Sequence, residues 1–280
     1  MEPAASPPTT WRIRTLNAAG IVVYCRQERF LEDDMSEPIE TIEGWYALHD
    51  FRRIDWTRWR DLNPSDRRQV VEDLSRLTAQ YAQVPRNQGS FAVYSILGHK
   101  ADLLFLHFRP DPKTLGALEQ QLDKGLAGAI LTRPYSYFSI VELSKYLAQG
   151  LTEEQARANL RGRLEPAIPD FEYVCFYPMN KRRQGKDNWY MVSRDERRVL
   201  MKTHGIIGHK YHDRVIQIIT GSQGLDDWEW GVTLFAADLL PIKKLIYEMR
   251  FDEASARFAD FGPFYVGPRI TSEGLKELFD

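Results

Sequence analysis

Apolar residues recur along most of the chain with the spacing of either a strand or an amphipathic helix, and the two spacings follow a regular order. In the first half the expected elements are a strand over 44–52, a helix over 63–81, a strand hairpin over 90–97 and 101–109, a helix from 111, and a strand over 135–143. The first helix has Asn63 as its cap and Pro64 at its first position, and its apolar stripe is Val70, Leu74, Leu77 and Tyr81.

The second half repeats this order with almost no residue-level identity to the first. Its expected elements are a strand over 171–179, a helix over 193–205, strands over 214–220 and 228–236, a helix over 241–251, and a strand over 258–267. Ser193 and Glu196 form a capping box, and Gly205 is expected just beyond the end of that helix. Each half therefore reads β-α-β-β-α-β, which predicts an α+β protein of two tandem ferredoxin-like units, of the dimeric α+β barrel type.

The pattern also predicts how the chain is divided. Residues 1–43 form an N-terminal extension that is partly disordered, since its first ten residues are proline-rich, and whose segment from 11 to 30 could add an edge strand. Residues 44–148 form the first ferredoxin-like unit, and residues 149–170 form a polar linker. Residues 171–280 form the second unit.

Composition narrows the class of protein. The 280 residues include 43% hydrophobic side chains and 12% aromatics, enough for a packed core, and the net charge of −2 argues against a nucleic-acid binder driven by overall basicity. Only two cysteines occur, which excludes a disulfide scaffold and a thiolate zinc site. No apolar run of membrane-spanning length and no signal-peptide pattern is present. These features predict a soluble, cytoplasmic protein.

The stretch YPMNKRRQGKDNWY, residues 177–190, is the most unusual in chemistry. If its strand persists, Tyr177, Met179 and Lys181 share one face, beside a basic loop that is suited to anions or is simply solvated surface. The six histidines show no HExxH spacing, and His204 is open to two interpretations, a metal ligand or a favourable cation at a helix end. From the residues alone the function stays open, with a pocket for an anionic aromatic ligand as one candidate.

Several long motifs carry a resemblance to a known family: GWYALHDFRRIDW, YPMNKRRQGKDNWY, RVLMKTHGIIG, VIQIITGSQGLDDWEWGVTLFA and IYEMRFDEASARFADFGPFYVG. Together, in order and spacing, they resemble the coproheme decarboxylases, the haem-synthesis branch of the chlorite-dismutase-like superfamily. The similarity runs from about residue 44 to about residue 270 and leaves most of the extension outside it.

The resemblance implies an enzyme that converts iron coproporphyrin III (coproheme) to haem b by oxidative decarboxylation of two propionates, with hydrogen peroxide as oxidant. The substrate is then also the redox cofactor. A homopentamer is implied, with transient contact to a coproporphyrin ferrochelatase, and neither nucleic acid nor membrane is an expected partner.

The resemblance also implies roles for individual residues. Tyr177 matches the radical tyrosine, His204 the proximal iron ligand, and Gln217 the distal residue. The expected porphyrin contacts are Arg163, Pro178, Met179, Asn180, Lys181, Trp189, Arg250 and Ser255. Relatives often have aspartate where this chain has Asn180, which is not the reacting group. Basic side chains suit a substrate with four propionates, because guanidinium and ammonium groups bind carboxylates.

Three alternatives stay open. A chlorite dismutase shares the fold and the proximal histidine but has a distal arginine, where this chain has Gln217. A haem carrier or sensor has no need of a radical tyrosine. A dye-decolourising peroxidase is a weaker option, because its distal aspartate is missing here.

Overall fold

The computed structural model describes residues 13–16, 22–24, 38, 40–144 and 150–279, in two compact units, Met1–Glu37 and Pro38–Asp280. In the first unit, strands β1 (Ile13–Leu16) and β2 (Val22–Tyr24) pair antiparallel as a sheet of their own. The segment predicted to add an edge strand therefore pairs with itself in the described part of the chain. The proline-rich first ten residues lie outside it.

The second unit is built on a single antiparallel sheet of nine strands whose order is β11-β10-β6-β3-β5-β4-β13-β7-β12. Strand β7 also pairs with β11, so the sheet returns on itself and closes into a barrel. The strands are β3 (Thr41–Ile54), β4 (Ser90–Ser95), β5 (Leu103–Arg109), β6 (Leu131–Ser144), β7 (Tyr173–Lys181), β10 (Ile216–Gly221), β11 (Trp230–Ala236), β12 (Ala259–Phe261) and β13 (Tyr265–Ile270).

Both halves of the barrel confirm the ferredoxin-like prediction. The first half has the strand order β6-β3-β5-β4 and the second the order β13-β7-β11-β10, so in each half the fourth strand of the repeat lies beside the first, then the third, then the second. The halves join through the pairs β6–β10 and β4–β13. The barrel of two ferredoxin-like units is therefore present, while the exact boundaries between the units stay a prediction.

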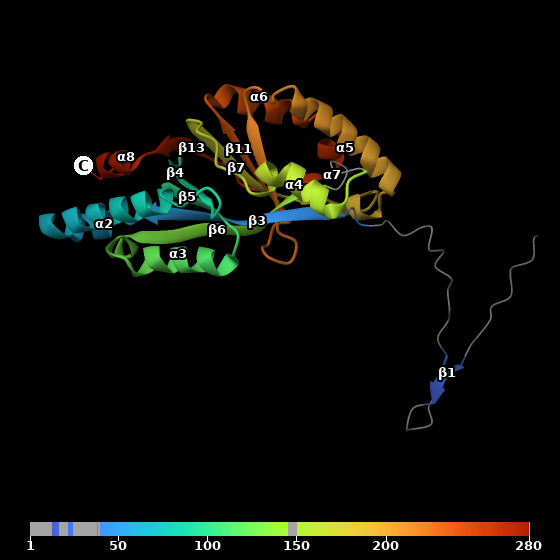
Figure 1. Cartoon of the computed structure of the whole chain (residues 1–280), viewed down its shortest axis with the longest axis horizontal. Helices are drawn as coiled ribbons and strands as arrows, with labels where there is room; N and C mark the ends of the chain where they lie inside the picture. The colour runs from blue at the N-terminus through green and yellow to red at the C-terminus, as the bar shows by residue number, and fades with distance from the viewer. Residues whose placement is uncertain (1–12, 17–21, 25–37, 39, 145–149, 280) are drawn as a thin grey trace, which may run out of the picture. The chain divides into compact units, whose positions relative to one another are not determined.

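Helices cover the outer face of each half, as Figure 1 shows for α2 and α3 on the first half and α5 and α6 on the second. The helices are α1 (Trp56–Asp61), α2 (Pro64–Ala82), α3 (Pro112–Lys124), α4 (Glu153–Leu164), α5 (Arg194–His209), α6 (Leu239–Met249), α7 (Glu253–Phe258) and α8 (Ser272–Glu277). The Asn63 side chain caps α2, whose buried residues include the predicted stripe. None of the described helices is both long and apolar enough to cross a membrane.

In the second half of the sheet, side chains alternate between the inside of the barrel and the outer face that the helices cover. On β7, Val174 and Phe176 pack inside the barrel, where His49 of β3 stacks on Phe176 with ring centroids 4.1 Å apart. Cys175 and Tyr177 point the other way and pack with residues of β11 and α6. This alternation follows from the two-residue period of a strand, and it turns Tyr177 toward the helices.

One prediction about local structure was wrong, and one segment holds a helix that was not predicted. Helix α5 continues to His209, so Gly205 lies inside it and His204 is not at its end. Gly205 does not have the positive φ that a glycine cap requires, and no side chain crowds it. The predicted polar linker carries α4, which begins with a capping box between Thr152 and Gln155 and packs against β3 and β6.

Candidate functional site

The candidate site lies on the helix-facing side of the second half of the sheet. In the strand register Tyr177 of β7 is opposite Val232 of β11, which is opposite Ile219 of β10. Gln217 lies one pleat further along β10 and faces the same way, because Ile218 between them belongs to the barrel interior. Ile219 is thus two strands from Tyr177, about 10 Å away. Gln217 and Ile219 are exposed, so this end of the face is open to a ligand.

Tyr177 sits in an aromatic environment. Its ring stacks on Phe264 with centroids 4.6 Å apart and lies 5.6 Å from the ring of Phe261. Only 6% of the residue is exposed. Burial raises the pKa of the Tyr177 phenol, so the hydroxyl keeps its proton at neutral pH and is present as a hydrogen donor. Met179, two residues on, is partly buried against the same cluster, as the alternation predicted.

Helix α5 presents His204 to a buried carboxylate. The Nδ1–H of His204 donates to Oδ2 of Asp252 at 2.8 Å, and the Asp252 side chain is fully buried while that of His204 is 32% exposed. Ser255 adds a hydroxyl 3.4 Å from Nδ1, and its Oγ donates to the same Oδ2 at 3.3 Å. A hydrogen bond from Nδ1 to a carboxylate fixes the tautomer in which Nε2 has the free lone pair. His204 is therefore prepared to bind a metal through Nε2.

Asp252 is the hydrogen-bond partner of His204, but the sequence did not predict it as a site residue. It is the N-cap of α7 and accepts from the backbone N–H of Ser255. A cap signal is visible in the sequence as aspartate before a short helical stretch, but nothing in the sequence connects it to a histidine 48 residues away.

Lys181 brings a cation to the same region. Its Nζ lies 4.3 Å from the ring centroid of Trp189, and Trp189 packs edge-to-face on Phe258 of α7. Burial lowers the pKa of Lys181 to about 8, and the nearby Asp252 and Glu229 carboxylates oppose that shift. An added anion, such as the carboxylate of a ligand, would stabilise the charged form of this buried lysine and raise its pKa.

The other predicted residues are placed less centrally. Asn180 Oδ1 accepts from the backbone N–H of Glu229 at 2.7 Å, and Pro178 accepts through its carbonyl from Gly262 at 2.8 Å. Both face away from Tyr177, because they alternate with it on β7. Arg250 follows α6 and holds its guanidinium 3.7 Å from the ring centroid of Phe261.

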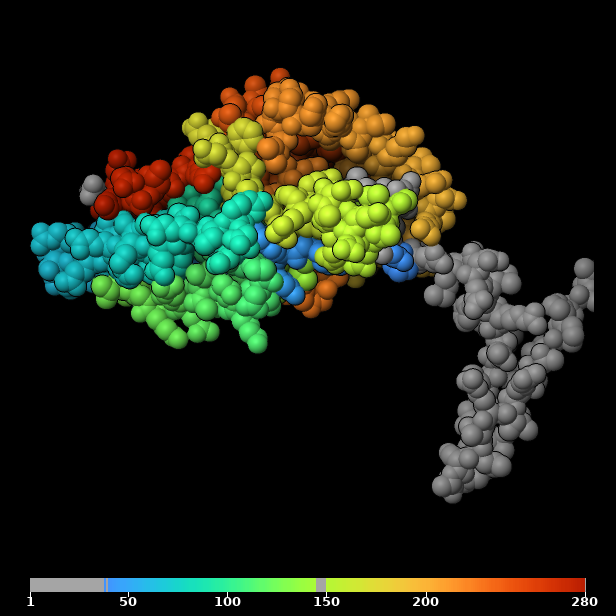
Figure 2. Space-filling view, in the orientation of Figure 1, coloured from blue at the N-terminus to red at the C-terminus, as the bar shows by residue number. Residues whose placement is uncertain are grey.

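Arg163 is exposed on α4. Figure 2 shows that α4 lies on one side of a hollow whose other side is α5, so the helix that carries Arg163 borders the region of His204. The structure thus brings His204, Ser255, Lys181 and Trp189 together and places Tyr177, Met179 and Gln217 on the adjoining sheet face, while Arg163 lies exposed on α4. Their roles toward a ligand stay predictions.

A metalloporphyrin fits this donor set. His204 offers an imidazole nitrogen, Lys181 offers an ammonium for a carboxylate, and Ile219 offers exposed apolar surface on the open sheet face. A closed barrel of two ferredoxin-like halves with such a site defines a dimeric α+β barrel protein of the haem-binding kind.

Comparison with known proteins identifies the family. The family described as Chlorite dismutase matches residues 59–270, and the chain belongs to it. A coproheme decarboxylase of Thermus thermophilus is 47% identical over 247 residues, which are 88% of this chain and 98% of that protein. A solved structure of a novel heme-binding protein from Thermus thermophilus has a TM-score of 0.82 at 47% identity, over 88% of this chain and 98% of the other.

A more distant likeness agrees in fold alone. The structure of chlorite dismutase from Candidatus Nitrospira defluvii in complex with imidazole has a TM-score of 0.68 at 19% identity, over 85% of this chain and 95% of that one. Chlorite dismutase activity is therefore not the favoured alternative.

Proposed function

We propose that this protein is a coproheme decarboxylase, an enzyme that converts two propionates of iron coproporphyrin III to vinyl groups and so forms haem b. The observation that carries the proposal is the pairing of His204 with buried Asp252 beside the sheet face that holds Tyr177. The curated relative at 47% identity carries the same name and is covered almost completely, which supports this activity above the alternatives.

Each residue has a defined task in this proposal. His204 binds the iron through Nε2, and Asp252 holds the ring in place and increases its basicity through Nδ1. Lys181 and Arg163 bind propionates, and Gln217 lies on the opposite side of the substrate from His204. Arg250 and Trp189 complete the pocket, and Ser255 supports the His204–Asp252 pair. The bound iron, with hydrogen peroxide, supplies the oxidising power.

Tyr177 performs the step on the propionate. Once oxidised to its neutral radical, its oxygen takes a hydrogen atom from the propionate β-carbon. The propionate radical then loses carbon dioxide and one further electron and becomes a vinyl group. Each propionate so gives up two electrons, which reduce one hydrogen peroxide to two water molecules with the uptake of protons. The raised pKa of the phenol keeps the O–H in place for each cycle.

We infer a homopentamer, a cytoplasmic location, and transient contact with a coproporphyrin ferrochelatase that delivers the substrate. The family resemblance supports these three inferences. Residues 1–43 have no assigned role in them.

The test is mass spectrometry of the porphyrin after the coproheme complex is titrated with hydrogen peroxide. Two successive losses, each of one carbon dioxide and two hydrogens, are expected. An intact porphyrin, or one that is only bleached, would contradict the proposal. Chlorite in place of peroxide is the control, and steady oxygen release from it would favour the dismutase.

A further inference from the structure

Residues 181–190 form a small hairpin, which we call the Lys181 hairpin. Its strands β8 (Arg183–Gln184) and β9 (Asp187–Asn188) pair antiparallel. The two ends of the hairpin meet, because the Nζ of Lys181 lies 4.3 Å from the ring centroid of Trp189. The place of the Lys181 ammonium group therefore depends on how the hairpin is held.

The carboxylate of Glu229, at the start of β11, contacts the Lys181 hairpin at several points. Its Oε2 accepts from the backbone N–H of Lys181 at 2.9 Å, and its Oε1 lies 3.7 Å from the guanidinium of Arg183. Burial raises the pKa of the Tyr190 phenol, and a hydrogen bond to Glu229 raises it further. The Glu229 side chain is only 12% exposed, so it makes these contacts largely away from solvent.

The backbone of Glu229 is held in turn by Asn180. The backbone N–H of Glu229 donates to Oδ1 of Asn180 at 2.7 Å. The regular ladder between β7 and β11 ends just before this point, where Trp230 is opposite Met179. Each of the two side chains accepts from the backbone of the other strand, and together they continue the connection past the end of the ladder.

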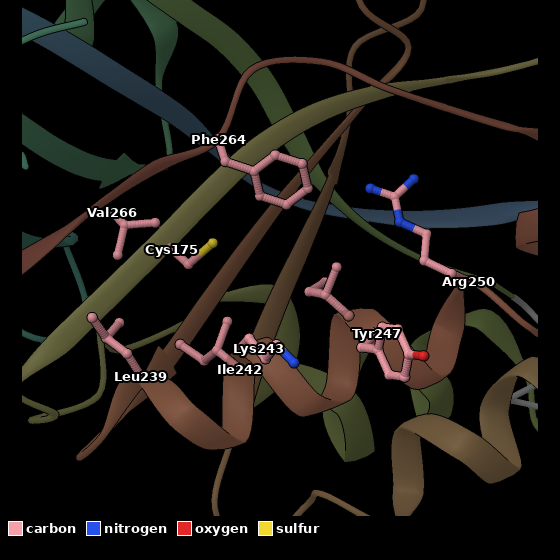
Figure 3. Close-up of a pocket in the computed structure, with 9 residues that line it drawn as sticks. Cys175, Leu239, Ile242, Lys243, Tyr247, Arg250, Phe264 and Val266 are labelled. Atoms are coloured by element: carbon pink, nitrogen blue, oxygen red, sulfur yellow. The ribbon is translucent and has the colours of Figure 1, made fainter. Parts of the chain in front are cut away.

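The cavity of the site does not itself position Lys181. It lies between α6 and the strands β7 and β13, and Figure 3 shows Phe264 and Arg250 among the residues that line it. Its volume is about 460 Å³, and neither Lys181 nor Glu229 lines it. A substrate carboxylate that reaches Lys181 therefore lies beyond the walls of this cavity, where the ammonium group depends on the hairpin for its place.

We propose that Glu229 is a positioning residue, which fixes the Lys181 hairpin and so places the Lys181 ammonium group for a substrate propionate. The inference rests on the proposed function for the identity of the ligand. A charge-assisted hydrogen bond requires a defined geometry, so a hairpin that is free to shift binds the carboxylate less tightly. The reach of the Glu229 oxygen to the Lys181 N–H is the essential feature of this role.

Three substitutions separate this reach from the negative charge. Glu229→Gln keeps an acceptor oxygen at the same reach, Glu229→Asp keeps the charge but withdraws the oxygen by one carbon, and Glu229→Ala removes both. Spectrophotometric titration with coproheme, without peroxide, measures affinity apart from any decarboxylation. We expect Glu229→Gln to bind within about threefold of the wild type, and the other two at least about tenfold more weakly.

Asp227→Ala is the matched control, because it removes an exposed carboxylate from the same loop. It should bind coproheme like the wild type. Wild-type affinity in Glu229→Ala would overturn the proposal, and so would a loss in Glu229→Gln as large as that in Glu229→Ala.

Combination with Lys181→Met shows whether Glu229 acts through Lys181. In the Lys181→Met background, Glu229→Ala should weaken coproheme binding by less than about twofold, because the group that it positions is absent. An equal loss in both backgrounds would overturn the positioning role, since Glu229 would then act on binding by another route.

Hydrogen exchange of the ligand-free protein tests the hairpin without any substrate. The amides of residues 181–190 should exchange faster in Glu229→Ala and Glu229→Asp, and at the wild-type rate in Asp227→Ala. Circular dichroism and thermal unfolding check that Glu229→Ala folds, and Glu229→Asp takes its place if it does not. A wild type that does not bind coproheme would contradict the proposed function, whereas unchanged exchange in the folded Glu229 variants would contradict the positioning role.

Discussion

The Nδ1–H of His204 donates a 2.8 Å hydrogen bond to Oδ2 of Asp252, a carboxylate that is fully buried at the start of α7. The relation joins the middle of one helix to the cap of another, 48 residues later. It leaves Nε2 as the one imidazole nitrogen available to a metal. In the proposed iron complex, Asp252 would set the electron-donating power of His204 without itself touching the iron.

Asp252→Asn should weaken this effect while the fold is retained, because asparagine is as good an N-cap as aspartate. We expect coproheme affinity to fall about 10- to 100-fold. The iron–histidine stretch in the resonance Raman spectrum should move to lower wavenumber, since the imidazole loses anionic character. Glu253→Gln, which removes an exposed carboxylate from the same helix and leaves Asp252 in place, is the matched control. An unchanged stretch in Asp252→Asn would remove the carboxylate from this role.

The lowered pKa of Lys181 predicts that the binding of coproheme depends on pH. Burial lowers its pKa to about 8 from an ordinary value of 10.5. The unfolded chain binds this proton more tightly than the folded chain does. The charged lysine therefore destabilises the fold below about pH 8, and this destabilisation disappears as the pH rises to about 10.5. A bound propionate favours the charged form, so coproheme affinity should decrease above about pH 8, by at most about tenfold per unit.

Lys181→Met keeps much of the side-chain bulk and should lose this pH dependence. Its affinity at pH 7 should be lower than that of the wild type, because the ammonium no longer meets the propionate. Spectrophotometric titration with coproheme from pH 6 to 9.5 measures both effects. A wild-type profile in Lys181→Met would show that another group titrates.

Gln217→Arg tests whether the distal residue alone separates the two activities of the family. We expect slower or less efficient use of peroxide, because a charged side chain on the open sheet face changes how the oxidant is held. We do not expect efficient oxygen release from chlorite, since that chemistry requires a matched pocket around the arginine. An oxygen electrode measures the rate. Steady release at the level of a dismutase would show that one residue is sufficient.

The sequence predicted the order of strands and helices because each element repeats its apolar spacing over enough residues to be recognised, as α2 does with Leu74 and Leu77. It also predicted that Tyr177 and Met179 share a face, which follows from the strand period alone. The capping box of Thr152 and Gln155 could have revealed α4 within the polar linker, since both residues stand at the required spacing.

Other features could not be predicted in this way. Gly205 was expected to end α5, but glycine only permits the conformation that ends a helix, and here the helix continues past it. The approach of Asp252 to His204 depends on how α7 packs against α5, which is a matter of tertiary packing and is visible only in the folded chain.

In the proposed reaction Tyr177 carries out the decarboxylation, and the variant Tyr177→Phe removes the group that does so. Phenylalanine keeps the ring that packs on Phe264 and removes only the phenolic O–H, so the fold and the affinity for coproheme should change little. Wild type and variant are titrated with hydrogen peroxide in parallel, and coproheme, the three-propionate intermediate and haem b are separated chromatographically. We expect haem b from the wild type, and unconverted or bleached coproheme from the variant. An ordinary yield of haem b from Tyr177→Phe would exclude Tyr177 from the reaction.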